Sequence, residues 1–286
     1  MCKLRWISIF GALACALVLA QSSAPFKPAA APKSLRLYVF DCGTLDIPDT
    51  SPYGFKPEEL ASKNMSIASC LIVHPKGTLM WDTGAVPDRN FKPGGGPATL
   101  RYATTKRPLE AQLAEVGYRP SDITYLAISH FHWDHVGNAN LFAHSTWLVR
   151  KEERDVMFSD PPSPRTEPAN FSQLKNSKTT FIDKPDYDVF GDGTVIIKAA
   201  PGHSPGHQVL FLKLKKTGPV VLSGDLYHYP EERKLGKIPT TEFNGQQTAA
   251  SRAEVEAFLK KTGAQFWIQH DLIANQKLKK SPAFYE

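Results

Sequence analysis

The sequence predicts a mixed α/β protein. Short apolar stretches rich in β-branched residues alternate along the chain with segments that have helical spacing. One pair of these stretches, 67–74 and 78–81, flanks a Pro-Lys-Gly turn and predicts a β-hairpin, so the sheet is not purely parallel. The 286 residues, 42% hydrophobic and 22% charged, are enough for a full core and exclude the collagen, coiled-coil and disordered classes.

The first half of the chain is predicted from short apolar runs and the residues that interrupt them. Residues 87–97 contain three consecutive glycines and are expected to form a mobile loop. This loop lacks the Lys-Ser/Thr pair and the following helix of a phosphate-binding loop. The expected elements are, in order, a strand at 35–40, the hairpin, a helix at 109–116, a buried strand at 123–128, a strand at 146–149 and a charged helix at 150–158.

The second half is predicted to contain more strands than helices. The Pro- and Asn-rich segment 160–178 is expected to be a surface loop. Ser251 and Glu254 have the spacing of a capping box, which predicts a helix from there to about residue 261. Strands are expected at 189–199, 208–215, 219–222 and 266–269.

The N-terminus has the layout of a secretory signal peptide. Lys3 and Arg5 precede an uncharged apolar stretch, and Val18 and Ala20 occupy the small-residue cleavage positions. A membrane anchor needs roughly twenty apolar residues, and this stretch is shorter. A lipoprotein site at Cys15 is a further alternative. We therefore expect a signal peptide at 1–20, a flexible lead-in at 21–33, one domain at 34–286, and a secreted or periplasmic protein without a stable membrane span.

Cleavage after Ala20 changes both the cysteine content and the charge. Cys42 and Cys70 remain, either as a disulfide or as two separate buried thiols. The formal net charge falls from +6 to +4 because Lys3 and Arg5 are removed. The lysine-rich stretches have no interleaved aromatic residues, so we expect no nucleic-acid partner.

A cluster of metal-binding residue types directly follows the buried strand 123–128. His130 and His132 are two residues apart, so an extended backbone turns them to the same side. Asp134 and His135 follow at once, and such a loop can offer ligands to two neighbouring metals. Three more candidates follow other strands, where a sheet would hold them rigidly: His203, Asp225 and His270.

This order of residues resembles the metallo-β-lactamase superfamily. The motif His-x-His-x-Asp-His is followed by His203 in a Pro-Gly-His-Ser-Pro-Gly-His loop, then by Asp225 and His270. Asp82 lies in an Asp-Thr-Gly turn that is similar to the turn supporting the metal loop in that superfamily. The resemblance implies an αββα sandwich of two mixed sheets with helices outside. His207 is expected to order its loop.

The resemblance also implies a ligand set for two divalent metals. His130, His132 and His203 would bind one metal, Asp134, His135 and His270 the other, and Asp225 would bridge them. Nitrogen and oxygen ligands suit zinc, with iron, manganese or cobalt as alternatives. Open coordination positions indicate a catalytic site.

Within the superfamily, the chain is most similar to the N-acyl homoserine lactonases. The bridging Asp225, the Leu-Tyr-Val-Phe-Asp-Cys-Gly strand at 37–43 and the chain end at 282–285 carry this resemblance. It implies a quorum-quenching lactonase that opens a small acyl lactone by attack of hydroxide held between the metals, and a possible homodimer. The alternatives are a broader hydrolase of other lactones, esters or β-lactams, and a non-catalytic metal-binding protein.

The catalytic and substrate-binding residues are predicted from position. Asp134 is expected to shuttle a proton to the leaving oxygen. The family has a tyrosine three residues after the bridging aspartate, where this chain has His228, so His228 or a neighbouring tyrosine, such as Tyr227, would contact the lactone carbonyl. The acyl chain is expected to contact Trp133, Phe131, Met65 and Phe91, although packing in the core is an alternative for Phe131.

Overall fold

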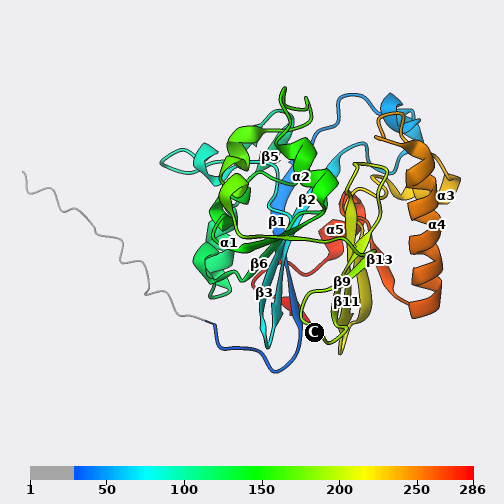
Figure 1. Ribbon diagram of the computed structural model, residues 1–286. Helices are drawn as coiled ribbons and strands as arrows, with labels where there is room; N and C mark the ends of the chain where they lie inside the picture. Colours follow the sequence, from blue (N-terminus) through cyan, green and yellow to red (C-terminus); the bar gives the residue numbers. More distant parts are fainter. Residues whose placement is uncertain (1–28) are drawn as a thin grey trace, which may run out of the picture.

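The computed structural model describes residues 29–286, which form two β-sheets packed face to face with helices on both outer sides (Figure 1). The larger sheet has the strand order β4-β5-β1-β2-β3-β6-β7-β8, with β14 paired to β1, and the smaller sheet has the order β13-β12-β11-β10-β9. Both sheets are mixed. The αββα sandwich expected from the sequence is therefore confirmed. The predicted signal peptide and most of the predicted lead-in lie outside the described residues.

The elements are short and follow one another closely. The larger sheet contains β1 (Arg36–Leu45), β2 (Met65–His74), β3 (Gly77–Trp81), β4 (Ala98–Leu100), β5 (Ala103–Thr105), β6 (Tyr125–Ala127), β7 (Thr146–Val149), β8 (Thr179–Phe181) and β14 (Phe284–Tyr285). The smaller sheet contains β9 (Asp186–Asp188), β10 (Val195–Ala199), β11 (Gln208–Leu214), β12 (Gly218–Leu222) and β13 (Gln265–Trp267). The helices are α1 (Leu109–Glu115), α2 (Lys151–Met157), α3 (Pro230–Leu235), α4 (Gly245–Thr262) and α5 (Leu272–Lys277).

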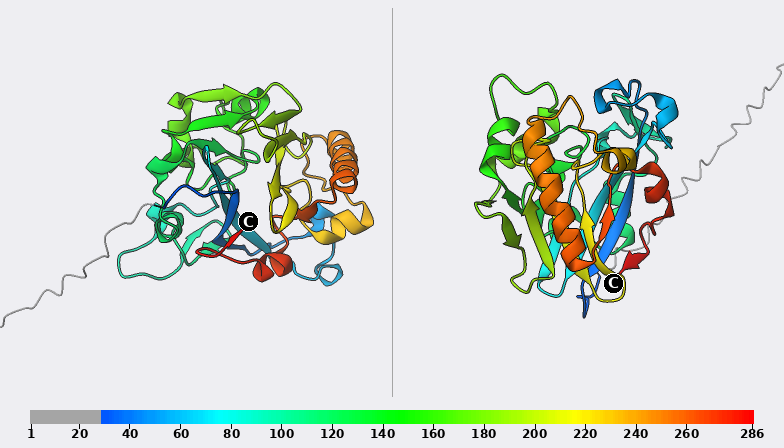
Figure 2. Two further views of the ribbon diagram at one scale, coloured as in Figure 1. Left: turned by 90° about the horizontal axis from the view of Figure 1, so that it is seen from below. Right: turned by 90° about the vertical axis from the view of Figure 1, so that its right-hand side faces the viewer.

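Alternating side chains build three apolar layers between these elements. In β2, Leu71 belongs to the layer that also contains residues of α1 and α2, and its neighbour Ile72 belongs to the layer between the sheets. In β11, Leu210 faces the other sheet and Phe211 packs with residues of α4. Successive residues of a strand point to opposite faces, so strands covered on both sides are apolar throughout. Figure 2 shows α4 along the outer face of the smaller sheet.

The structure confirms the predicted hairpin and helix 109–116 and corrects two other elements. β2 and β3 pair antiparallel as expected. The strand predicted at 189–199 begins only at Val195, because the Asp188 carboxylate accepts hydrogen bonds from the backbone N–H groups of Gly191 and Gly193 and closes a turn. The segment 160–178 is not wholly a surface loop, since Phe171 and Leu174 are buried in the core.

The capping box predicted at Ser251 and Glu254 is wrong. Helix α4 begins earlier, and its N-cap is Asn244, whose side chain accepts hydrogen bonds from the backbone N–H groups of Gln246 and Gln247. Ser251 lies inside the helix and donates to the Pro201 carbonyl at 2.6 Å. This bond ties α4 to the loop that follows β10.

Candidate active site

Seven potential metal ligands lie together beyond the carboxyl ends of strands from both sheets. All seven are buried, with no more than 8% of any residue exposed. Because the loops follow rigid strands, the sheets fix where each side chain can reach. The residues are His130, His132, Asp134 and His135 after β6, His203 after β10, Asp225 after β12 and His270 after β13.

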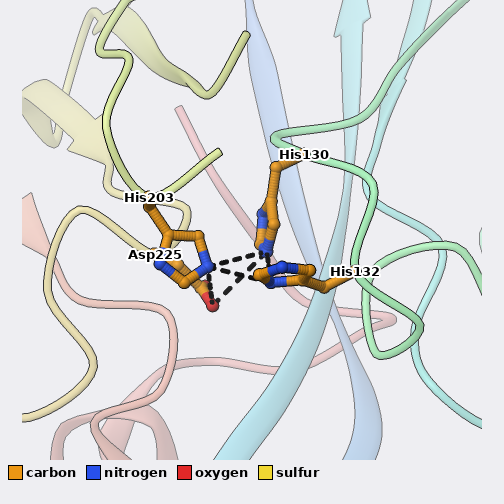
Figure 3. A group of neighbouring side chains, drawn as sticks. All are labelled: His130, His132, His203 and Asp225. Atoms are coloured by element: carbon orange, nitrogen blue, oxygen red, sulfur yellow. Dashed lines mark hydrogen bonds and ion pairs between the residues drawn. The ribbon is translucent and has the colours of Figure 1, made fainter. Parts of the chain in front are cut away.

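The first group consists of three imidazoles and one carboxylate whose ligand atoms converge (Figure 3). His132 Nδ1 lies 2.8 Å from His130 Nε2 and 2.9 Å from His203 Nε2. Asp225 Oδ2 lies 3.5 Å from His130 Nε2 and 3.4 Å from His203 Nε2. A tetrahedral ion with bonds of about 2.0–2.1 Å separates its ligand atoms by roughly 3.3 Å, so these four atoms fit one such ion.

The second group uses the other oxygen of the same aspartate. Asp225 Oδ1 lies 3.2 Å from His135 Nε2 and 3.1 Å from His270 Nε2. Asp134 Oδ2 lies 3.7 Å and 3.6 Å from the same two nitrogens. Asp225 Oδ1 and His135 Nε2 are buried without a hydrogen-bond partner, and a coordinated cation would satisfy both. Asp225 is therefore placed to bridge two cations.

The electrostatics of the first group favour ligation. Burial, together with neighbouring imidazoles, holds the pKa of His130, His132 and His203 well below the usual value, which leaves neutral nitrogens with free lone pairs. Burial alone would raise the pKa of Asp225, but His270, His135 and His130 hold it well below its usual range. The first-group donors are thus neutral imidazoles and a carboxylate, the forms that bind divalent metals. In the second group, burial alone would lower the pKa of His135, but Asp225, Asp134 and Asp82 hold it well above its usual value while no cation is bound.

Asp82 hydrogen-bonds to residues 129–135, the segment that carries four of the ligand candidates and is called the metal-ligand loop below. It is fully buried directly after β3, and one carboxylate oxygen lies 3.0 Å from His135 Nδ1. It also accepts hydrogen bonds from the backbone N–H of Ser129 at 2.6 Å and from Gln269 Nε2 at 2.8 Å. A carboxylate bonded to the second nitrogen of a ligating histidine fixes the orientation of its ring. Sequence reasoning missed Gln269, which precedes His270.

His207 positions the bridging aspartate through the backbone. Its Nδ1 donates to the Ala200 carbonyl, and its Nε2 accepts the backbone N–H of Asp225, both at 2.9 Å. The approach is close because Gly224 has a φ of +49°, and a Cβ there would lie 2.6 Å from His207 Nε2. His207 therefore orders this part of the site without facing the cation positions.

Two further groups orient ligand histidines and were not predicted. Glu242 Oε1 lies 3.0 Å from His203 Nδ1. His270 Nδ1 donates to the Ser66 carbonyl at 2.8 Å. Each bond directs the Nε2 atom of its histidine toward the cation positions. A lone glutamate in an irregular segment carries no sequence signal for such a role.

A cavity of about 290 Å³ opens onto these ligands. Met65 and Trp133, two of the residues predicted to contact the acyl chain, line it. The structure adds Tyr53, Arg101 and Arg165, none of which the sequence indicated. The cavity wall thus combines apolar and aromatic side chains with the polar ligand residues and two arginines.

Three predicted residues do not face the cavity. Phe131 is 6% exposed and packs in the core, because the alternation that turns His130 and His132 inward turns Phe131 away. Phe91 packs against the same core layer. Tyr227 packs with residues of α4, and its hydroxyl donates to Glu256 at 3.3 Å. These three substrate-contact predictions are corrected.

His228, in contrast, lines the cavity and is held by a buried ion pair. Its Nδ1 lies 3.3 Å from Glu232 Oε1, and Arg252 donates to the other Glu232 oxygen at 2.7 Å. Its Nε2 lies 3.4 Å from Asp225 Oδ2. Burial alone would lower the pKa of His228, but Glu232 and Asp225 raise it to about 10. Sequence reasoning found His228 but neither of its supports.

The two cysteines among residues 29–286 are free. Cys42 and Cys70 are both buried, and Cys42 donates to Ser69 Oγ at 3.2 Å. The structure therefore shows the two separate thiols, one of the two alternatives. Within residues 29–286, no helix has the length and apolar character that crossing a membrane requires.

The fold and the ligand cluster together define a metal-dependent hydrolase. The family model of the metallo-beta-lactamase superfamily matches residues 65–270, which contain all seven ligand candidates. The chain belongs to the metallo-beta-lactamase superfamily.

Its relatives point to one branch of that superfamily. The chain is 29% identical to the N-acyl homoserine lactonase AttM of Azorhizobium caulinodans, over 88% of this chain and 99% of the relative. A crystal structure of a quorum-quenching N-acyl homoserine lactone lactonase matches with a TM-score of 0.72 and 24% identity, over 87% of this chain and 97% of the other. AidC, a dizinc quorum-quenching lactonase in complex with a product, matches with a TM-score of 0.64 and 19% identity, over 91% and 96%.

Proposed function

We propose that this protein is an N-acyl homoserine lactonase that uses two divalent cations, most simply zinc. The observation that carries the proposal is the bridging geometry of Asp225, whose two oxygens face two separate groups of ligands. The similarity to AttM over almost the whole chain and the dizinc AidC structure support the same reaction and the same number of metals.

Each of the site residues has a separate role in the proposed lactone hydrolysis. Bound at the two groups, divalent cations supply a hydroxide nucleophile near neutral pH and polarise the lactone carbonyl. Asp134 lies at the cavity wall and is the carboxylate placed to move a proton to the leaving ring oxygen. His228 is the side chain at the same wall that can contact the lactone carbonyl. Met65 and Trp133 provide apolar surface for the acyl chain.

The first test is a substrate panel on metal-loaded protein. Acyl homoserine lactones, a β-lactam, a thioester and a phosphodiester are compared by proton release, and bound metal is counted by elemental analysis. We expect turnover of the lactones and two metals per chain in wild type. We expect His270→Ala to lose turnover and bound metal. The exposed His144 provides a matched control, since His144→Ala should change neither value. Turnover of another substrate class without lactone hydrolysis would overturn the proposal.

The second test addresses the proton shuttle. Asp134→Asn keeps one ligand oxygen and removes the carboxylate, so we expect turnover to fall by about 10²-fold or more with only modest loss of metal. Unchanged lactone hydrolysis in this variant would remove Asp134 from the mechanism.

We also propose that the protein acts outside the cytoplasm after cleavage of residues 1–20. The basic start, the apolar stretch and the small residues at 18 and 20 support this proposal. The test is mass spectrometry of the protein from a fractionated bacterial host. A mature N-terminus at Gln21 in the periplasm or medium is expected, and an intact Met1 in the cytoplasm would contradict it.

A further inference from the structure

An arginine without a carboxylate partner stands beside the first ligand group. Arg165 lines the cavity, and its Nη1 atom lies 3.4 Å from His132 Nε2. Among the described residues, Arg165 forms no ion pair, whereas its neighbour Arg101 is paired with Glu167 at 3.3 Å. A guanidinium is always charged and only donates hydrogen bonds. Arg165 can therefore donate hydrogen bonds to an acceptor that occupies the cavity.

The backbone holds Arg165 against the metal-ligand loop. The backbone N–H of Trp133 donates to the Arg165 carbonyl at 3.0 Å. Arg101 adds a hydrogen bond to the carbonyl of the next residue, Thr166, at 3.4 Å, and its guanidinium lies 5.1 Å from the Trp133 ring centroid. The Arg165 side chain is thus anchored at its base beside the residues that form the cavity wall.

His132 supplies a second donor at the same point. Its Nδ1 atom faces the other first-group ligands, so when Nδ1 binds a cation the hydrogen of the neutral ring is on Nε2. His132 Nε2–H and the Arg165 guanidinium are then two donors 3.4 Å apart with no acceptor between them. An oxygen about 2.9 Å from each nitrogen would make good hydrogen bonds with both.

The acyl lactone offers such an oxygen at a matching position. The donor pair is separated from the first ligand group by the width of one imidazole ring. In an acyl homoserine lactone, the amide carbonyl is three bonds from the lactone carbonyl carbon, and a 3-oxo group is two bonds further along the chain. Both are carbonyl oxygens, and a charged donor strengthens the hydrogen bond to either.

We propose that Arg165 and His132 form a donor pair that binds a carbonyl oxygen of the acyl chain, and that Arg165 determines specificity for acyl-substituted lactones. The inference rests on the proposed function. The oxygen is that of the amide or of a 3-oxo substituent, and the experiment separates these two sources.

The experiment compares three substrates in four proteins. The substrates are N-hexanoyl homoserine lactone, its 3-oxo derivative, and an alkyl γ-lactone without an amide. The proteins are wild type, Arg165→Met, Arg165→Lys, and Arg107→Met as a matched control outside the cavity, where Arg107 is paired with Glu115. We expect Arg165→Met to raise KM for acyl homoserine lactones about tenfold with little change in kcat, and to leave the alkyl lactone unaffected. Arg165→Lys keeps a charged donor, so its rise in KM should be smaller.

The pattern of KM identifies the oxygen. An equal rise in KM for both acyl lactones places the amide carbonyl at the donor pair. A rise in KM only for the 3-oxo derivative places the chain carbonyl there. A comparable rise in KM for the alkyl lactone, no rise for any substrate, or the same rises in Arg107→Met would overturn the proposal.

A binding measurement separates this proposal from the proposed function. Calorimetry with N-(3-oxohexanoyl)-homoserine, which carries both carbonyls, and with homoserine is carried out on wild type and Arg165→Met, with and without bound metal. We expect about tenfold weaker binding of the acylated ligand in the variant and no change for homoserine. If wild type hydrolyses no lactone, the proposed function fails. In that case calorimetry still tests the donor pair, and unchanged binding of the acylated ligand in Arg165→Met would overturn it.

Discussion

Two buried carboxylates, Asp82 and Glu153, hold the metal-ligand loop from different sides. Asp82 bonds to the backbone of Ser129 and directly to the ligand His135. Glu153 lies in α2, and its Oε1 atom accepts a hydrogen bond from the backbone N–H of Phe131 at 2.5 Å. Its Oε2 atom accepts a hydrogen bond from the Ser204 hydroxyl at 2.7 Å. It also accepts the backbone N–H of Gly206 at 2.8 Å.

The difference lies in what each carboxylate touches. Asp82 bonds to a ligand imidazole, so it sets both the orientation and the charge of the second ligand group. Glu153 touches no ligand side chain and joins the loop after β6 to the loop after β10. Loss of Asp82 should therefore lower both metal affinity and stability, whereas loss of Glu153 should act on the stability of the fold alone.

Removal of Asp82 should have the largest effect. Asp82→Ala leaves His135 and Ser129 without their acceptor, which costs about 3–5 kcal/mol of stability when a buried charged network is broken. Asp82→Asn keeps the volume, and we expect metal affinity to fall about 10–100-fold, with activity falling in parallel. Metal content after dialysis and kcat/KM measure both effects.

A second His–Asp pair provides the control for Asp82. Asp192 lies 2.8 Å from His74 Nε2, remote from the ligand cluster. Asp192→Asn should leave metal content and kcat/KM unchanged. If Asp82→Asn retained both metals at wild-type affinity, the difference drawn between the two carboxylates would be incorrect.

Glu153 should produce a smaller, pH-dependent effect on stability. Burial raises the pKa of Glu153 to about 7, although hydrogen bonds from Ser204, Gly206 and Phe131 and the nearby His135 act against it. Between pH 4.5 and 7, the Glu153 carboxyl is therefore protonated in the folded protein and ionised in the unfolded chain. Its contribution to the free energy of unfolding is fully present below about pH 4.5 and declines by roughly 2–3 kcal/mol as the pH rises to 7.

The variant Glu153→Gln isolates this contribution. The unfolding free energy of metal-free wild type and variant is measured by urea titration from pH 4.5 to 8. Other groups titrate in the same range, but they are common to both proteins and cancel in the difference. We expect the advantage of wild type to shrink as the pH rises to 7 and then to level off. A constant difference would contradict the raised pKa.

The smallest effect is expected at Ser204. Ser204→Ala removes one of three donors to Glu153 and should cost about 1 kcal/mol with little change in activity. Urea unfolding at neutral pH measures it. Ser159, exposed and bonded to Pro161, gives the matched control, and equal losses in the two variants would argue against a specific role for the Ser204 bond.

The sequence predicted the fold class and the residues that gather at the site because those signals are local. Strand 123–128 and the histidines after it are adjacent in the chain, and Asp82 was found through its turn. The alternation that turns His130 and His132 inward also favours a core position for Phe131, the alternative that the structure shows.

The remaining parts of the site depend on contacts that the chain pattern does not encode. Glu153 lies in a helix of charged residues that resembles a solvated surface helix, and its partner Ser204 is 51 residues away. Arg165 lies in a segment without regular structure, and its position beside His132 follows only from the packing of that segment on the metal-ligand loop. Such pairs require the tertiary fold.

The origin of the ligands in both sheets has a thermodynamic consequence. His130 and His132 follow a strand of the larger sheet, whereas His203 and Asp225 follow strands of the smaller one. A cation held by all four binds only while the sheets are together, so its binding free energy adds to the free energy of unfolding. At a free concentration one hundred times its Kd, each such ion would contribute about 2.7 kcal/mol. The melting temperature of this protein should therefore report how much free metal surrounds it.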